Sequence, residues 1–471
     1  MGFSLSHADF GFGMAFAVIA GIFAANLGWP PLIICAIVPI ILGGAYALQK
    51  LTLIECVFLI LSLIAGIFYF HIYLAWRAKG VSMPFEEKVA FSAIVSDEPE
   101  PVAHSVILNA NLQMPLKGSV EILAPPESDF HYGDLITVNG KIEPSDAPGS
   151  NPFVLPTAVT FISAHHGFWL REAMINLKHA IITKLDGWLS PDNAAFLAGV
   201  LFGAKGYLTQ SLKSALSRTG TTHLVAVSGY KVTLVLLAAG TLFQGFVAKR
   251  IAFFGTAGVL ILFVLMVGNA ASAIRAAIMG FIALTAKEIG EEFNMRNAIT
   301  FTALIMSLEN PTILTQDLSF IISFLSVLGI VYLAPPFQKL FHVSHAGVLE
   351  WKHAAITTLA AQIATIPILA NAFGQFSLVA IPANILTLSL LPLTMCFGFG
   401  TALIGFASTH IAFGAAQILG FILSYQLAVI RFFAVHALPL PLDFSSGFLM
   451  AAYYAVLAAF AYSYRNNNEK V

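Results

Sequence analysis

The chain has 471 residues, of which 58% are hydrophobic and only 10% are charged, and its formal net charge is −1. Soluble globular domains carry about 25% charged residues, so the composition excludes that class. Repeated apolar runs of about 17 to 25 residues instead predict an α-helical polytopic membrane protein, because a run of that length spans a bilayer.

Residues 1–79 are predicted to form the N-terminal transmembrane helices, because apolar runs lie near 12–28, 31–48 and 52–75. The N-terminus lacks the basic region that begins a secretory signal peptide, so we expect the first run to be a retained helix. The three cysteines lie in apolar runs without paired spacing, which predicts neither a disulfide framework nor a zinc site.

Residues 80–165 change character and predict a small, water-soluble all-β domain inserted between membrane segments. Segments rich in Pro, Asp, Ser and Gly separate five short β-like runs, which are KVAFSAIV, HSVILNANL, GSVEILA, DLITVNGKIE and AVTFISA. Five short strands suit an OB-like barrel. The domain holds eleven acidic residues against three lysines, a net charge of −8, so we expect it to bind phosphate groups poorly.

Residues 166–220 are predicted to form amphipathic helices in the membrane interface. Apolar residues recur at three-to-four spacing in two stretches; they are Leu170, Met174, Leu177, Ile181, Leu185 and Trp188 in the first, and Leu208, Leu212, Ala215 and Leu216 in the second. Lys213 and Arg218 lie off the second stripe and are the expected interfacial basic residues. The alternative is a soluble linker helix packed on the barrel.

Residues 221–471 predict the remaining membrane crossings. Nine apolar runs follow one another, near 221–247, 251–268, 271–289, 297–309, 316–334, 354–371, 377–407, 411–431 and 446–463, which gives about twelve crossings in all. Basic residues favour the cytoplasmic side. We therefore expect both termini in the cytoplasm and the barrel outside, which places four basic clusters in the cytoplasm, at 249–250, 287–296, 339–352 and 465–470. Three basic residues, Arg77, Lys79 and Arg431, do not fit this orientation.

The run THLVAVSGYKVTLV (222–235) contains Lys231 about ten residues from either end of its apolar stretch, and Arg275 lies among small residues in a later run. A cation within a membrane costs about 2.5–3.5 kcal/mol on insertion scales, so such residues usually face a bundle interior or a watery cavity. No acidic residue in the later runs lies deep enough to pair with them plainly, so the two cations favour an anionic substrate. The alternative is a structural role, with bonds to backbone carbonyls or to Glu55.

Ser228 and Lys231 also match Ser-x-x-Lys, the nucleophile pattern of penicillin-recognising hydrolases. No Ser-Asp-Asn triplet accompanies the pair, and the Lys-Thr-Gly-like triplet at 218–220 precedes the serine. We therefore expect no enzymatic activity, with an intramembrane Ser–Lys hydrolase as the enzyme alternative. Gly229 reads more simply as a helix break that lines a cavity. No P-loop and no metal-ligand spacing occur, so we expect no cofactor and no metal.

Several long segments resemble the ComEC family, the membrane channel proteins of natural competence. The blocks occur in the family's order; they are LAGVLFGAKG to VSGYKVTLV (197–235), ASAIRAAIM (271–279), ENPTILTQ to VYLAP (309–335) and TTLAAQ to NILTL (357–388), with YGDLITVNGKIEPSDAPGSNPF (132–153) upstream. The resemblance covers nearly the whole chain.

This resemblance implies an inner-membrane channel that translocates single-stranded DNA during transformation, with its barrel outside. It implies membrane lipid, a cytoplasmic helicase-like ATPase and DNA-receptor proteins as partners, and leaves open whether the chain forms a homo-oligomer. Lys231 and Arg275 would then line a path for phosphates, with polar neighbours His223, Ser228, Gly229 and Asn269. The alternative is a competence-like transporter of another anionic polymer or solute.

Three departures from the family pattern bear on function. The printed sequence ends at Val471 without the metallo-β-lactamase motif that many relatives carry, so we expect a short form without that nuclease, and the sequence leaves open whether a separate polypeptide supplies one. Tyr230 and Lys231 stand where the family has Leu-His, which keeps the position cationic. The β domain is acidic and lacks the family's cysteines, so we expect it not to grip DNA.

Overall fold

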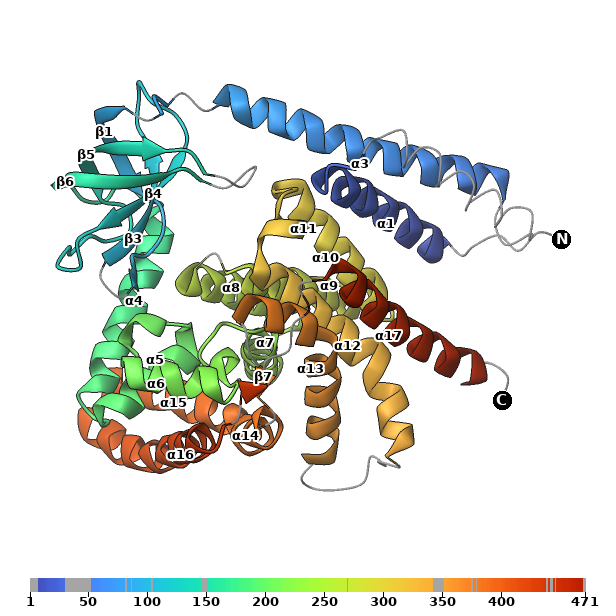
Figure 1. Cartoon of the computed structure of the whole chain (residues 1–471). Coiled ribbons are helices and arrows are strands. Elements are labelled where there is room, and N and C mark those ends of the chain that lie inside the picture. The colour runs from blue at the N-terminus through green and yellow to red at the C-terminus, as the bar shows by residue number, and fades with distance from the viewer. Residues whose placement is uncertain are drawn as a thin grey trace. The chain divides into compact units, whose positions relative to one another are not determined.

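The computed structural model describes residues 7–468 (Figure 1), with gaps at 30–51, 81–82, 86, 103–104, 146–150, 269, 342–350, 374–375, 378, 438, 441–443 and 445. The chain forms two compact units, one of Met1–Ile175 with Val235–Leu318 and the other of Asn176–Leu234 with Ser319–Val471. The described residues are mostly helical, with one small β barrel. The predicted second membrane helix at 31–48 lies outside the described residues.

The barrel forms where the sequence predicted strands. Its elements are β1 (Lys88–Val95), β2 (Glu100–Val102), β3 (Ser105–Leu112), β4 (Ser119–Ala124), β5 (Leu135–Glu143) and β6 (Phe153–Ser163). The strands pair in the order β1-β5-β6-β4-β3, and β3 pairs back with β1, which closes the barrel. The β4–β6 pair is parallel and the others are antiparallel. Five strands therefore close the barrel, and β2 pairs only with β3 as an additional short strand.

Alternation along the strands separates the barrel core from its outer surface. On β3, Val106, Leu108, Ala110 and Leu112 point into an aliphatic core, whereas Asn109 and Asn111 lie on the outer face. Two elements differ from the prediction. β6 begins at Phe153, earlier than the predicted run, because its first residues pair with β4. β2 lies in a segment predicted as a turn, where Glu100–Val102 folds back on β3.

In the first unit, three helices run parallel: α1 (His7–Asn26), α3 (Leu53–Gly80) and α10 (Met295–Glu309). α1 and α3 approach so closely that a side chain at Gly21 or Gly66 would collide with the opposite backbone. Small residues at such contacts are the usual means of packing membrane helices. Figure 1 shows these two helices side by side.

Polar contacts fix both ends of α1 against α10 and the short helix α11 (Ile313–Gln316) that follows it. At one end Asp9 forms an ion pair with Arg296, whose guanidinium also lies over the Phe12 ring. At the other end Asn26 Nδ2 donates to Thr315 Oγ1 at 2.7 Å. α10 and α11 together therefore run along the length of α1, which is a candidate membrane span.

The remaining elements of this unit are α8 (Lys249–Val267), which ends at Gly268 with a positive φ of +95°, and α9 (Ala271–Ile289). The second unit contains α5 (Pro191–Phe202), the 3₁₀ turn η1 (Lys205–Tyr207), α6 (Gln210–Arg218), η2 (Thr222–Leu224), α12 (Leu318–Leu340), α13 (Trp351–Phe373), α14 (Ala380–Leu388), α15 (Leu391–Ala407), α16 (Thr409–Val435) and α17 (Gly447–Asn468). It also holds the strand pair β7 (Phe376–Ser377) and β8 (Pro439–Leu440). Helices α4 (Trp169–Asp186) and α7 (Gly229–Gln244) begin in one unit and end in the other.

Among the described residues, eight helices are long and apolar enough to cross a membrane, and the bent pair α14–α15 makes nine if it forms one span. They are α1, α3, η2 with α7, α8, α12, α13, α16 and α17. The runs predicted at 271–289 and 297–309 form α9 and α10, which are not among the eight. The chain is therefore a membrane protein with many apolar helices, and the predicted crossing number remains a prediction.

The paired ends of α1 and α10 predict specific crosslinks. In a background without the native cysteines, we expect Asn26→Cys with Thr315→Cys, and Asp9→Cys with Arg296→Cys, to be joined by a short bismaleimide, because each pair is in direct contact. The mismatched pair Asp9→Cys with Thr315→Cys serves as the control and should stay unlinked. Mobility on a denaturing gel reports the result; bridging of the mismatched pair, or of neither matched pair, would contradict this alignment.

Candidate functional site

Helix α5 lies at the centre of the second unit. Every residue from Asn193 to Phe202 is buried, and the helix contacts α15 and α16. Pro191 begins the helix, where its missing N–H is not needed, and Gly203 ends it with φ +75°. The sequence did not predict this helix, because its apolar run of about ten residues is too short for a membrane span.

Lys231 extends its side chain to the C-terminal end of α5. Its Nζ donates to the carbonyl oxygen of Gly199 at 3.2 Å, and the residue is only 1% exposed. The carbonyls at the C-terminal end of a helix carry its negative dipole end, so an ammonium is stabilised there, although the Gly199 oxygen also accepts from the Gly203 amide at 2.9 Å. The sequence analysis gave a bond from Lys231 to a backbone carbonyl as the alternative to an anion-binding role, and the structure contains such a bond.

Two glycines allow this arrangement by removing side chains from α5. A Cβ at Gly199 would lie 2.9 Å from Val225 Cβ, and a Cβ at Gly203 would lie 2.5 Å from Val227 Cγ2. Both valines belong to the segment between η2 and α7, which therefore lies directly on the end of α5. The close approach places α7, and Lys231 in its first turn, against the Gly199 carbonyl.

The other candidate residues of this unit surround the same segment. α7 begins at Gly229, so the apolar run around Lys231 is a turn followed by a helix and not one straight helix. His223 is exposed in η2, and Ser228 is half-buried, with its carbonyl accepting from the Lys231 and Val232 amides. In α6, Leu212 and Leu216 are buried together with Leu208 before it, which confirms the predicted apolar face, whereas Arg218 is exposed and Lys213 half-buried.

Arg275 belongs to the first unit, in the second turn of α9, and is 6% exposed. It therefore lies near the start of its helix and not at its middle. Asn269 lies outside the described residues. Glu55, the proposed alternative partner, accepts hydrogen bonds from the Thr52 amide and hydroxyl.

The first amphipathic stretch forms α4, but its buried face differs from the predicted stripe. Ile181 and Leu185 of that stripe are buried as predicted, but Leu177 is 39% exposed, and the buried face also includes Arg171, Ile175, Lys178 and Ile182. Arg171 tolerates burial because it is paired with Asp97 at 2.6 Å and donates to the Ser96 carbonyl at 3.0 Å. Periodicity alone could not anticipate these partners, which come from the loop after β1.

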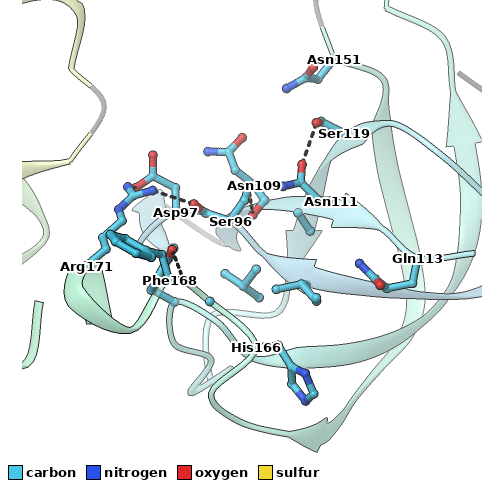
Figure 2. A pocket seen from close by; sticks show the side chains of 15 residues that line it. Ser96, Asp97, Asn109, Asn111, Gln113, Ser119, Asn151, His166, Phe168 and Arg171 are labelled. Carbon is cyan, nitrogen blue, oxygen red and sulfur yellow. Dashed lines mark hydrogen bonds and ion pairs between the residues drawn. The ribbon is translucent and has the colours of Figure 1, made fainter. Parts of the chain in front are cut away.

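These contacts form one end of a pocket of about 620 Å³ on the barrel (Figure 2), lined by residues of β1, β3, β4 and the start of α4. Ser119 Oγ donates to Asn111 Oδ1 at 2.7 Å elsewhere in the lining. Sequence reasoning missed this pocket, since its residues come from segments far apart in the chain. Within the described residues, no cluster of three His, Cys, Asp or Glu side chains could hold a metal ion.

The comparison with known families matches the part of the chain that contains both Lys231 and Arg275. The family model described as Competence protein matches residues 200–466. The chain belongs to this competence (ComEC) family. The matched region contains both Lys231 and Arg275, every described element from η1 to β8, and all but the last two residues of α17.

One competence-family relative is ComE operon protein 3 of Bacillus subtilis (strain 168), which is 29% identical over 220 residues. The match covers 45% of this chain and 26% of that protein, so the chain corresponds to about a quarter of its relative's length. No solved structure matches the chain.

The Gly199–Val225 contact predicts a site-specific loss of stability. We expect Gly199→Ala to lower the free energy of unfolding by about 1–3 kcal/mol, because the added methyl overpacks a buried contact. Gly420→Ala on α16 is the matched control, since its Cβ would meet only Leu189 at an ordinary 3.7 Å. Thermal unfolding in detergent measures both; equal midpoints for the two variants would contradict the close approach.

Proposed function

We propose that this chain is an inner-membrane channel subunit that translocates single-stranded DNA during natural transformation and has no enzymatic activity of its own. The observation that carries the proposal is the competence-family match over residues 200–466. The printed sequence has no P-loop, so the proposal assigns the driving energy to a partner ATPase.

In this proposal, Lys231 and Arg275 are the fixed positive charges that phosphates pass, with His223, Ser228, Gly229 and Asn269 as polar neighbours. The α5 C-terminus supports this role for Lys231, because its Gly199 carbonyl holds the buried ammonium at 3.2 Å. During transport a phosphate would share the ammonium with the Gly199 carbonyl.

The proposed topology has both termini in the cytoplasm and an OB-like barrel outside, with about twelve crossings. α1 and α3 are parallel candidate spans, so both begin on the same side of the membrane, and the proposal keeps the crossing predicted from the sequence between them. The Asp9–Arg296 pair supports placing the N-terminus on the side of the basic cluster at 287–296. A five-strand closed barrel supports the OB-like assignment.

The first test is fluorescence anisotropy of a labelled single-stranded oligonucleotide with the detergent-purified protein across a salt series. We expect binding that weakens with salt, because phosphate contacts release counterions. Lys231→Gln with Arg275→Gln should weaken binding. It should also reduce the slope of log affinity against log salt concentration by up to about two, because two positive charges are lost. Absence of binding at every salt concentration would favour a transporter of another anionic polymer or solute.

The choice of glutamine separates charge from structure at residue 231. Lys231→Gln keeps an N–H donor for the Gly199 carbonyl but removes the charge, whereas Lys231→Met removes both. If the charge serves DNA, both variants lose DNA binding; if Lys231 is purely structural, Lys231→Gln binds DNA as the unmodified protein does and only Lys231→Met unfolds more easily.

Charge reversal should act on transport itself. We expect Lys231→Glu to abolish DNA uptake while the protein still inserts in the membrane, because a carboxylate would repel each phosphate. Lys117→Glu, at an exposed position between β3 and β4, is the matched control and should leave uptake unchanged. Normal uptake in Lys231→Glu cells, measured as transformant number at equal protein level, would contradict the cationic path.

A further inference from the structure

The outer pocket of the barrel has a chemistry different from that of a phosphate site. It has a volume of about 620 Å³ and is lined by uncharged polar side chains of β3 and β4 and the turn between them: Asn109, Asn111, Gln113 and Ser119. Asn111 on β3 lies opposite Ile94 of β1 and Ser119 of β4, so three adjacent strands present this surface. Figure 2 shows Asn109 near Ser96 and Asp97, and Gln113 on the side of the pocket away from Arg171.

The charges of the pocket are already paired. Its lining contains the guanidinium of Arg171 and the carboxylate of Asp97, which bond one another at 2.6 Å. Arg171 also donates to the Ser96 carbonyl and stacks 4.7 Å from the centre of the Tyr132 ring. A phosphate would have to displace Asp97 from this arrangement, inside a domain whose net charge is −8.

The remaining groups both donate and accept hydrogen bonds. Each Asn or Gln amide offers two N–H donors and one carbonyl acceptor. A phosphodiester has acceptors only, so it leaves amide oxygens without partners, whereas a hydroxyl or acetamido group satisfies donors and acceptors together. The Ser119–Asn111 bond orients the Asn111 amide. The backbone carbonyl of Asn109 accepts from the backbone amide of Ser96 at 2.7 Å, which holds these two lining residues together.

An exposed aromatic surface adjoins the amides. Phe168 lines the pocket and remains 53% exposed, although its backbone amide is held by the Tyr132 hydroxyl at 3.0 Å. Trp169 follows it and is 70% exposed. A flat apolar ring beside polar groups suits a ligand with one apolar face and a hydroxylated edge.

We propose that this pocket binds a neutral oligosaccharide, with Asn109, Asn111 and Gln113 bonding its hydroxyl and acetamido groups and Phe168 packing against a sugar ring. Barrels of the OB class bind oligosaccharides as well as oligonucleotides, and the acidic charge of this one favours the neutral ligand. The inference is independent of DNA translocation, which the proposed function places in the membrane helices.

The test is calorimetric titration of the full chain in lipid nanodiscs, since maltoside detergents carry a competing sugar. We expect chitotetraose, the neutral tetramer of N-acetylglucosamine, to bind with an affinity that does not change between low and high salt. Asn109→Ala with Asn111→Ala should weaken binding at least about tenfold, because two hydrogen-bonding amides are lost. Phe168→Ala should also weaken binding, whereas Phe168→Tyr should retain it.

Asn139→Ala is the matched control, because Asn139 is an exposed outward residue of β5 that does not line the pocket. It should bind chitotetraose as the unmodified chain does. Absence of heat with chitotetraose, equal binding in the double Asn variant and the unmodified chain, or displacement of the sugar by a twelve-residue oligothymidylate would overturn the proposal. The last outcome would instead assign the pocket to nucleic acid.

Discussion

The lysine ammonium at the end of α5 constrains much of the second unit. Lys231 is 1% exposed and needs an oxygen partner, which it finds in the Gly199 carbonyl at 3.2 Å. That oxygen lies at the negative dipole end of α5, where it also accepts from the Gly203 amide, and Lys231 reaches it because glycines let the η2–α7 segment lie on the helix. A buried helix, a helix break and a buried cation therefore depend on one another.

Several other buried polar side chains of the same unit form hydrogen bonds between its helices. Asn193 on α5 donates to Ser424 Oγ at 3.0 Å, and Gln426 of α16 joins Thr394 of α15 to the Thr387 carbonyl of α14 at 3.0 Å each. The two Gln426 bonds together bridge the break between α14 and α15, where the pair bends by 44°. Freed backbone groups in a membrane protein require such partners, since lipid offers none.

The barrel and the helical part of the chain present opposite electrostatic surroundings. The family match lies in the helices, which hold the buried cations Lys231 and Arg275, whereas the β domain is acidic and its pocket has paired charges and amides. Long-range fields favour a polyanion near the first and oppose it near the second. This division is the physical reason to assign different ligands to the two parts of one chain.

The sequence by itself determined the class of the protein and the five barrel strands, because long apolar runs and period-two alternation are local signals. It also determined the buried face of α6, which depends only on helical spacing. The tertiary structure alone decided where Lys231 bonds, that Arg171 and Lys178 face inward on α4, and that α5 is a buried helix. Each of these depends on groups distant in sequence: Gly199 lies 32 residues from Lys231, and Asp97 lies 74 from Arg171. The barrel pocket also could not be predicted from the sequence, because its walls come together only when β3 pairs with β1.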